Sequence, residues 1–448
     1  MIGAALSRWT MAYFAAAFGF LLLAEALMAC GYGFPAVAIE APETLVLVHV
    51  AAIGWLSLLM CGALFQFVPV LVAQPLQGGR LVLPALACLL AGLACLLAGF
   101  LALAGTVAPH LPAFPIAGVL LAAGFGLMAW IVGRTLWSAR SGGLPMPARF
   151  VAVGLACLLA TAALGVTFVL VLSGLLPQAA GVLAHGLPAH AAAGLAGWLT
   201  FTAIGVSYRL LPMFMLAPDG ARRTTHLAWW CGSAALLLAV VAVPLEQAVS
   251  DSWLAAALAG LCGCVALSCY GADLVFFYRN RRRKAIELNS RSAVAAFACL
   301  CLTVLLALGL LAFGDLGRYA GALVFLAAFG WLSGLGLSQL YKIVPFLTWL
   351  ECYGPVMGRK PTPRVQDLVA ERRDGPWFIL YFAAVVAGTV MLLADRPDFF
   401  RLAAGLMLTA TAAIGLELVL ARRLFNVAED KRLPEGTVRP RLFLATPR

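Results

Sequence analysis

Long apolar runs follow one another along the whole of the 448-residue chain. A run of roughly 20 apolar residues is long enough to cross about 30 Å of hydrocarbon as an α-helix. Charged residues make up only 11% of the chain, whereas soluble proteins carry about 25%. The sequence therefore predicts an all-α polytopic membrane protein with twelve transmembrane helices, near residues 11–33, 45–71, 82–105, 115–137, 151–175, 182–214, 227–246, 253–277, 293–314, 319–349, 376–394 and 399–421.

The positive charge of the chain, +11 in total, is unevenly distributed. Basic residues gather in alternate connections and in the tail: Arg80; Arg134, Arg140 and Arg149; Arg222 and Arg223; Arg279, Arg281, Arg282, Arg283, Lys284 and Arg291; Arg359, Lys360, Arg364, Arg372 and Arg373; and the tail from Arg422. Retention of lysine and arginine on the inner side determines topology. We therefore expect a multi-pass protein in the lipid bilayer of a bacterial-type inner membrane, with both termini cytoplasmic and no nucleic-acid partner.

Three stretches of the chain repeat one pattern, here called the signature. They are GWLSLLMCGALFQFVP at 54–69, GWLTFTAIGVSYRLLP at 197–212 and GWLSGLGLSQLYKIVP at 330–345. Each begins Gly-Trp-Leu-Ser/Thr, with an aromatic residue eleven positions after the first glycine and a proline fifteen positions after it. The copies are 143 and 133 residues apart, too far for a solenoid module. The repeating unit therefore contains several helices.

Three copies and twelve spans predict three pseudo-symmetric units of four helices, with the signature in spans two, six and ten. The units cover about 1–149, 150–290 and 291–424 of a single membrane domain, 1–448, and residues 425–448 form a cytoplasmic tail. On an ideal α-helix the shared glycine, aromatic and proline positions fall within about 80°. We interpret the signature as a packing seam that brings spans two, six and ten together.

Glu25 lies in the middle of the first span, in FLLLAEALMAC. A carboxylate at that depth is expensive, so we expect it to face protein and to be paired or protonated. Two interpretations fit its position: a step on a proton or cation path, and a buried hydrogen bond to a neighbouring helix.

Three histidines precede the first two copies of the signature: His49, and then His185 and His190 on either side of Pro188. Neutral imidazole is the commonest metal ligand and can hold a haem iron axially. On ideal helices His49 and His190 differ in depth by about 3 Å but point about 140° and about 20° away from their signature glycines. The residues alone leave two interpretations open: ligands of haem or copper, and polar side chains that bond between helices or line a wet cavity.

Long polar side chains follow the signature aromatics, among them Arg209 and Lys342. They could bind an anion such as a haem propionate, a quinone oxygen or a lipid phosphate. Alternatively, they snorkel to the headgroups from their positions near helix ends. A further charged residue, Asp273, is expected to pair with the basic run 279–284.

Twelve helices in units of four, with histidines ahead of the signature, resemble subunit I of the haem–copper oxidases, a superfamily that includes the nitric oxide reductases. The likeness is sharpest around His49, Trp55, Gly62, Phe65 and Pro69. The chain also resembles the NnrS-like membrane proteins of nitric-oxide response, which bind haem and copper. The resemblance implies haem or copper bound through His49, His185 and His190.

The departures from the oxidases concern the reactive centre. The span-ten positions that match His49 and His190 are Phe325 and Leu323, which cannot ligate iron, and span seven lacks the adjacent histidines of the copper site. We therefore predict a non-catalytic relative of subunit I, acting in nitric-oxide or metal response or in support of a respiratory complex. A proton-coupled transporter and a cofactor-free assembly partner are the alternatives, because haem, copper and no cofactor all fit the residues.

Overall fold

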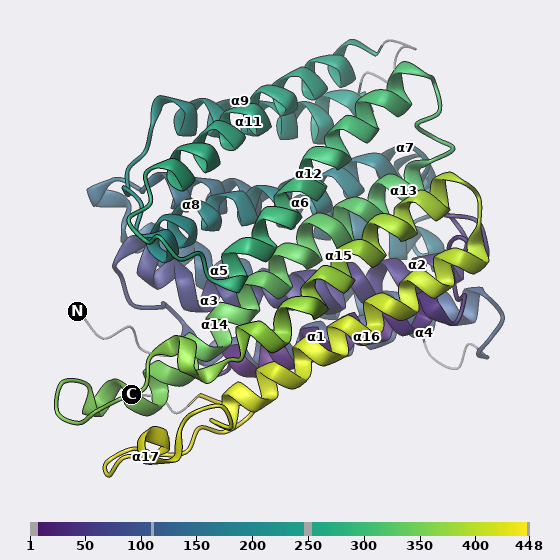
Figure 1. Cartoon of the computed structure of the whole chain (residues 1–448). Coiled ribbons are helices and arrows are strands. Elements are labelled where there is room, and N and C mark those ends of the chain that lie inside the picture. The colour runs from purple at the N-terminus through teal and green to yellow at the C-terminus, as the bar shows by residue number, and fades with distance from the viewer. Residues whose placement is uncertain (1–7, 109–111, 246–252, 446–448) are drawn as a thin grey trace. The chain divides into compact units, whose positions relative to one another are not determined.

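A computed structural model describes residues 8–108, 112–245 and 253–445 (Figure 1). Within these ranges the chain is helical, without a β-strand, and twelve helical spans are long and apolar enough to cross a membrane. The prediction of an all-α polytopic membrane protein with twelve spans is confirmed. Residue 246, the last of the predicted seventh span, and residues 446–448 of the tail lie outside the described ranges.

Nine spans run without a signature. They are α1 (Thr10–Ala29), α4 (Val82–Leu103), α5 (Ala113–Ser138), α6 (Met146–Leu172), α9 (Arg223–Leu237) with its π-helical extension η6 (Leu238–Ala242), α11 (Leu254–Arg279), α12 (Leu288–Ala312), α15 (Glu371–Leu393) and α16 (Pro397–Arg422). The helix α15 begins five residues before its predicted span, because hydropathy does not register the polar first turn that begins at Glu371.

Each signature span changes from α-helix to π-helix and back. The segments are α2 (Pro42–His49), η1 (Val50–Ser57) and α3 (Leu58–Val72); α7 (Ala180–Ala191), η5 (Ala192–Phe201) and α8 (Thr202–Met215); and α13 (Ala320–Phe325), η7 (Leu326–Ser333) and α14 (Gly334–Tyr353). Each of these three π-helical segments, η1, η5 and η7, contains the Gly-Trp-Leu-Ser/Thr of its copy. Such segments are rare and frequently mark functional sites. The three copies thus share a local backbone structure as well as a sequence.

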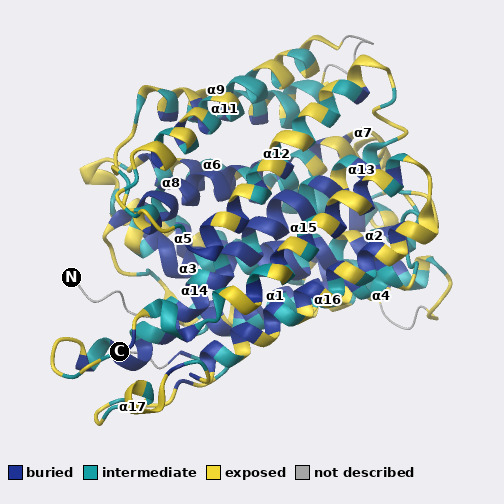
Figure 2. Ribbon diagram, in the orientation of Figure 1, coloured by how far each residue is buried: buried dark blue, intermediate teal, exposed yellow. Residues whose placement is uncertain are grey.

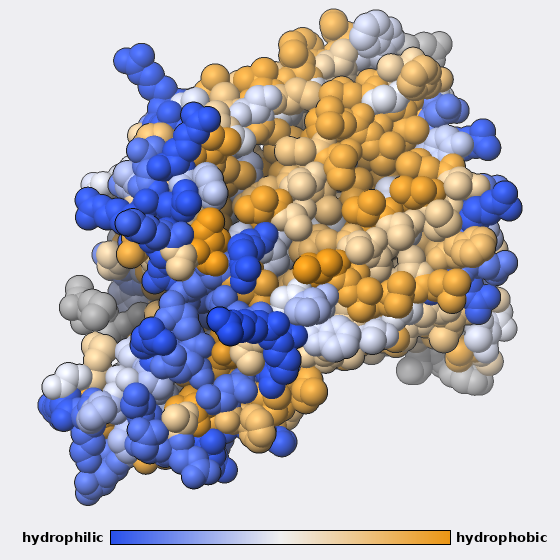
Figure 3. Space-filling model, in the orientation of Figure 1, coloured by the Kyte–Doolittle hydropathy of each residue, from blue (hydrophilic) through white to orange (hydrophobic). Residues whose placement is uncertain are grey.

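The described chain divides into two compact units: Met1–Ala63 with Ile286–Arg448, and Leu64–Ala285. In the first unit, α1 packs on η1 and α16, and α12 packs on η7 and α14. Most of the tenth span is buried there, whereas most of α12 is not (Figure 2). In the second unit, α6 packs on η5, α8 and α5, and α9 packs along α11. Figure 3 shows mainly hydrophobic side chains along the visible faces of α12, α15 and α16.

The tail of the first unit packs on the end of α14. Leu424 and Val427 form a small buried cluster with Cys352, Tyr353 and Leu368. The Tyr353 hydroxyl donates to the Arg432 carbonyl over 2.6 Å, next to the short helix α17 (Glu429–Arg432). The first part of the tail therefore packs on the end of α14.

The signature glycines contact the span that precedes each signature span. An added Cβ would lie 2.6 Å from Phe20 of α1 at Gly54, 2.3 Å from Phe150 of α6 at Gly205, and 2.9 Å from Cys299 of α12 at Gly330. Small residues let transmembrane helices approach this closely. The predicted seam is therefore present, and these glycines pack against spans one, five and nine. In the third copy Gly336 also approaches span two, since an added Cβ would lie 2.7 Å from Leu59. That the seam brings span six to the same place stays a prediction.

We predict that Gly205→Ala lowers the free energy of unfolding by about 1–3 kcal/mol, since the new methyl group meets both Phe150 and the backbone carbonyl of Pro147. The measurement is thermal or SDS-induced unfolding of the purified protein. Gly126→Ala on α5 is the matched control, because no atom lies within 4 Å of its added Cβ. Equal stability of the two variants would contradict this packing.

Candidate functional site

The two histidines nearest the signature lie directly before π-helical segments. His49 is the last residue of α2, and His190 is the last but one of α7. Because π-helical hydrogen bonds join residues five apart, the rotation per residue is smaller than in an α-helix. The directions expected for His49 and His190 on ideal helices therefore do not apply, since π-helical residues separate each histidine from its glycine.

Both of these rings are oriented by a backbone carbonyl. In the first unit, His49 Nδ1 lies 2.7 Å from the Leu45 carbonyl, one turn back on the same helix. In the second unit, His190 Nδ1 lies 3.0 Å from the Thr161 carbonyl of α6, and the ring packs on Phe168. A carbonyl only accepts, so each Nδ1 carries the hydrogen and, in the neutral ring, Nε2 carries the lone pair. Metal-binding histidines are commonly oriented in this way.

His185 differs from the other two histidines. It lies on α7 but is exposed, and none of the residues that the structure describes forms a hydrogen bond that orients its ring. At the span-ten position that matches His49, Phe325 is buried and packs on Phe329 and Phe400, with ring centroids 5.2 Å apart in both pairs. Among the described residues, no three His, Cys, Asp or Glu side chains are grouped so as to hold a metal ion.

Glu25 is completely buried in the first unit. Thr411 of α16 donates to Glu25 Oε1 over 2.9 Å, so the predicted bond to a neighbouring helix is present. The other oxygen, Oε2, has no hydrogen-bond partner among the described residues. Oε2 can therefore bind a proton or accept a hydrogen bond.

The signature tryptophan and serine bond to each other across two copies. Trp55 Nε1 donates to Ser333 Oγ over 2.8 Å, and Ser333 Oγ lies 2.7 Å from the Ala328 carbonyl of η7. The neighbouring carbonyl, of Phe329, accepts from the Tyr381 hydroxyl over 2.9 Å. These bonds hold η7 to two other spans, and in the third copy they give the polar residue after Gly-Trp-Leu a structural role.

The signature aromatics of the second and third copies each bond to a buried aspartate. Tyr208 donates to Asp273 of α11 over 2.9 Å, and Tyr341 donates to Asp374 of α15 over 2.6 Å. The first copy has Phe65 at this position and no hydroxyl. Asp273 also accepts from Arg222, at 2.7 Å, and from two threonines. The expectation that Asp273 pairs with the basic run 279–284 was wrong.

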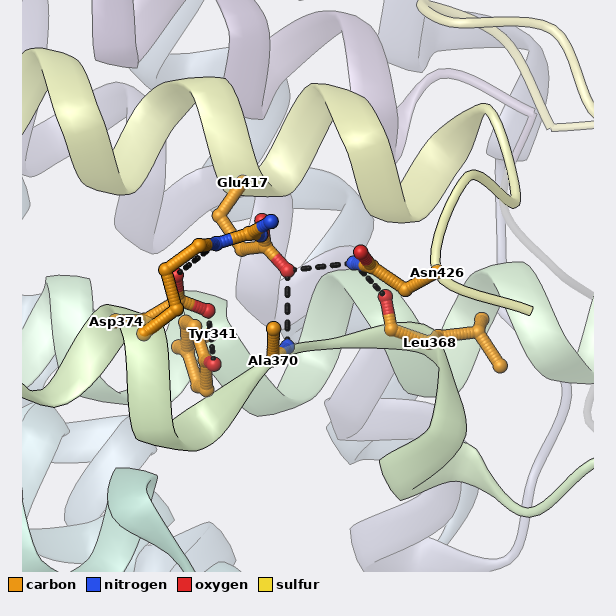
Figure 4. Close-up of polar contacts among 7 residues, drawn as sticks. Tyr341, Leu368, Ala370, Asp374, Glu417 and Asn426 are labelled. Atoms are coloured by element: carbon orange, nitrogen blue, oxygen red, sulfur yellow. Dashed lines mark hydrogen bonds and ion pairs between the residues drawn. The ribbon is translucent and has the colours of Figure 1, made fainter. Parts of the chain in front are cut away.

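Asp374 belongs to a larger polar network of the first unit (Figure 4). Arg373 lies between Asp374, at 3.2 Å, and Glu417 of α16, with which it also forms an ion pair. Glu417 Oε1 accepts from the Ala370 backbone amide at 3.0 Å and from Asn426 at 2.7 Å. Sequence reasoning missed this network, although one signal was present: a single glutamate near the end of the last apolar span.

Arg209 and Lys342 both form ion pairs within their own units. Lys342 Nζ lies 2.5 Å from Glu287, and both side chains are largely buried. Arg209 pairs with Asp219, and both are partly exposed. Each cation thus has a carboxylate partner in its own unit, and the two sequence interpretations, anion site and snorkelling, stay predictions.

No protein-family model matches the chain, and no curated protein is detectably similar to it. The site must therefore be judged on its own chemistry. The first unit has an oriented histidine, a half-satisfied carboxyl group and an aspartate bonded to a signature tyrosine. The second unit, taken by itself, has an oriented histidine and an aspartate bonded to a signature tyrosine.

We predict that Tyr341→Phe destabilises the protein by about 1–3 kcal/mol, because it removes a donor from a buried carboxylate while leaving the ring in place. Unfolding in detergent measures the effect. Tyr278→Phe, at an exposed tyrosine, is the control and should change little. If Tyr341→Phe lowers the free energy of unfolding no more than Tyr278→Phe does, the bond to Asp374 contributes nothing to stability.

Proposed function

We propose that this membrane protein is a non-catalytic relative of haem–copper oxidase subunit I that binds haem through His190 or His49. The chain would consist of three units of four helices in a bacterial-type inner membrane, with both termini in the cytoplasm. It would act in nitric-oxide or metal response, or beside the subunits of a respiratory complex. The observation that carries the proposal is the orientation of both rings by backbone carbonyls, next to π-helical segments.

The metal-binding side chains of the described residues fit haem better than a copper ion held by protein ligands alone. The macrocycle supplies most ligands of a haem iron, so a single axial imidazole is enough. Copper sites usually combine several protein ligands, whereas the described histidines do not come with two further metal-binding side chains. Bound haem would supply redox or gas-binding chemistry. This chain would supply an imidazole nitrogen to the iron, and the carbonyl of Leu45 or Thr161 would hold that ring in its orientation.

The test is a pyridine haemochrome assay with metal analysis on detergent-purified protein expressed with a haem supply. We expect stoichiometric haem, lost in whichever of His190→Ala and His49→Ala removes the axial ligand. His185→Ala is the matched control, because this exposed histidine lies on the same helix as His190. Stoichiometric copper without haem would select the other metal, and absence of both would favour the cofactor-free assembly partner.

A second candidate function is proton-coupled transport, favoured by Glu25 Oε2, which has no hydrogen-bond partner among the described residues. Ionisable groups inside a membrane commonly mark proton relays. A carboxyl group that uses only one oxygen for packing can take up and release a proton at the other. Thr411, the donor to Oε1, would hold the group in place.

If Glu25 carries protons, Glu25→Gln will abolish proton flux into proteoliposomes under an imposed membrane potential, followed with a trapped pH dye. Thr411→Val should weaken the flux, while Thr409→Val, whose hydroxyl bonds within its own helix, should leave it unchanged. Equal flux through wild-type and Glu25→Gln proteoliposomes would leave Glu25 as a packing residue only.

A further inference from the structure

Two helix ends of the second unit bring basic residues together. The helix α9 begins at Arg223 and packs along α11, which ends at Arg279. An ion pair joins the ends, because Arg222 Nη1 lies 2.7 Å from Asp273 Oδ1. We call the following residues the α9–α11 basic patch: Arg222, Arg223, Arg279, Arg281, Arg282, Arg283 and Lys284.

The chain that carries this patch is held in place at a third helix. The backbone amides of Arg282 and Arg283 donate to the carbonyls of Leu216 and Met215, at 3.2 and 3.3 Å. These carbonyls belong to the C-terminal end of α8, where intrahelical partners run out. In addition, the Arg281 guanidinium lies 4.0 Å from the centroid of the Tyr278 ring. The basic run is therefore built onto the ends of α8 and α11.

Few carboxylates balance this charge. Asp273 is buried and already accepts from Arg222, Tyr208 and two threonines, and Asp219 pairs with Arg209. Among the residues that the structure describes, Arg223, Arg279, Arg282 and Lys284 are exposed and form no ion pair. Like charges at this density repel one another, and an anion beside them would relieve the repulsion.

The patch lies at the ends of two candidate membrane spans, since Arg223 and Arg279 are their terminal residues. Tyr278 of α11 is exposed beside it, at 45%, and such aromatics are enriched at the membrane–water interface. These positions place the patch at the level of the lipid headgroups. Figure 3 shows hydrophilic side chains gathered at this end of the two helices. An anion that reaches the patch from the bilayer is a lipid phosphate.

We propose that the α9–α11 basic patch binds the headgroup phosphate of an anionic phospholipid. Guanidinium groups match phosphate oxygens in a two-pronged geometry, and each basic residue near an anionic membrane surface contributes about 1 kcal/mol. Arg222 and Arg281 are held by Asp273 and by the Tyr278 ring. The exposed cations Arg223, Arg279, Arg282 and Lys284 contact the phosphate.

Binding of phosphatidylglycerol to the detergent-purified full chain, followed by native mass spectrometry or a fluorescent lipid, tests the proposal. The triple variant Arg279→Gln, Arg282→Gln, Lys284→Gln should bind on the order of a hundredfold more weakly, from three lost contributions of the stated size. Phosphatidylcholine should bind the wild-type protein no better than it binds this variant.

The matched control removes three exposed cations elsewhere: Arg359→Gln, Arg372→Gln and Arg423→Gln. This variant should bind like wild type, and an equal loss in both triples would overturn the proposal. Full competition by millimolar inorganic phosphate would assign the patch to free phosphate instead of lipid. If the triple variant of the patch does not fold, the salt dependence of lipid binding to the wild-type protein provides the test. Binding should weaken steeply as the salt concentration rises, and salt-independent binding would contradict a headgroup site.

Discussion

A polar group inside a bilayer must find its partner within the protein, because hydrocarbon offers none. The buried aspartates of the described spans follow this constraint. Each buried aspartate, Asp273 and Asp374, is matched by a tyrosine and by arginine, and the carbonyls of η7 accept from a serine and a tyrosine. The packing of both units depends on these matches, since an unpaired charge at that depth would cost more than any single apolar contact returns.

The constraint also gives meaning to the exception at Glu25. One carboxyl oxygen is satisfied by Thr411, and the other has no partner among the described residues. Among the described acidic residues, Glu25 is the one with a buried carboxylate oxygen that has no hydrogen-bond partner. The histidines are different in kind, because in each ring Nδ1 is bonded to a backbone carbonyl.

The signature links these observations. Its glycine provides close approach to the preceding span, its tryptophan and serine bond two copies together, and its aromatic holds an aspartate in the second and third copies. The first copy carries Phe65 and no such aspartate bond. The second copy has two histidines ahead of it and the third has none. The copies thus share their packing residues and differ in their polar ones, as expected when architecture is kept and chemistry diverges.

The sequence by itself determined the twelve spans, the three signature copies and the residues that can carry chemistry. Each span reflects the hydropathy of consecutive residues, a local property that needs no tertiary contact. Only the tertiary structure decided which charges pair, as with Asp273 and Arg222, or Glu417 and Arg373, because these partners lie 51 and 44 residues apart. It also decided the π-helical segments. Hydrophobic pattern does not distinguish a wide turn from an α-helical one, and side chains from other spans stabilise it.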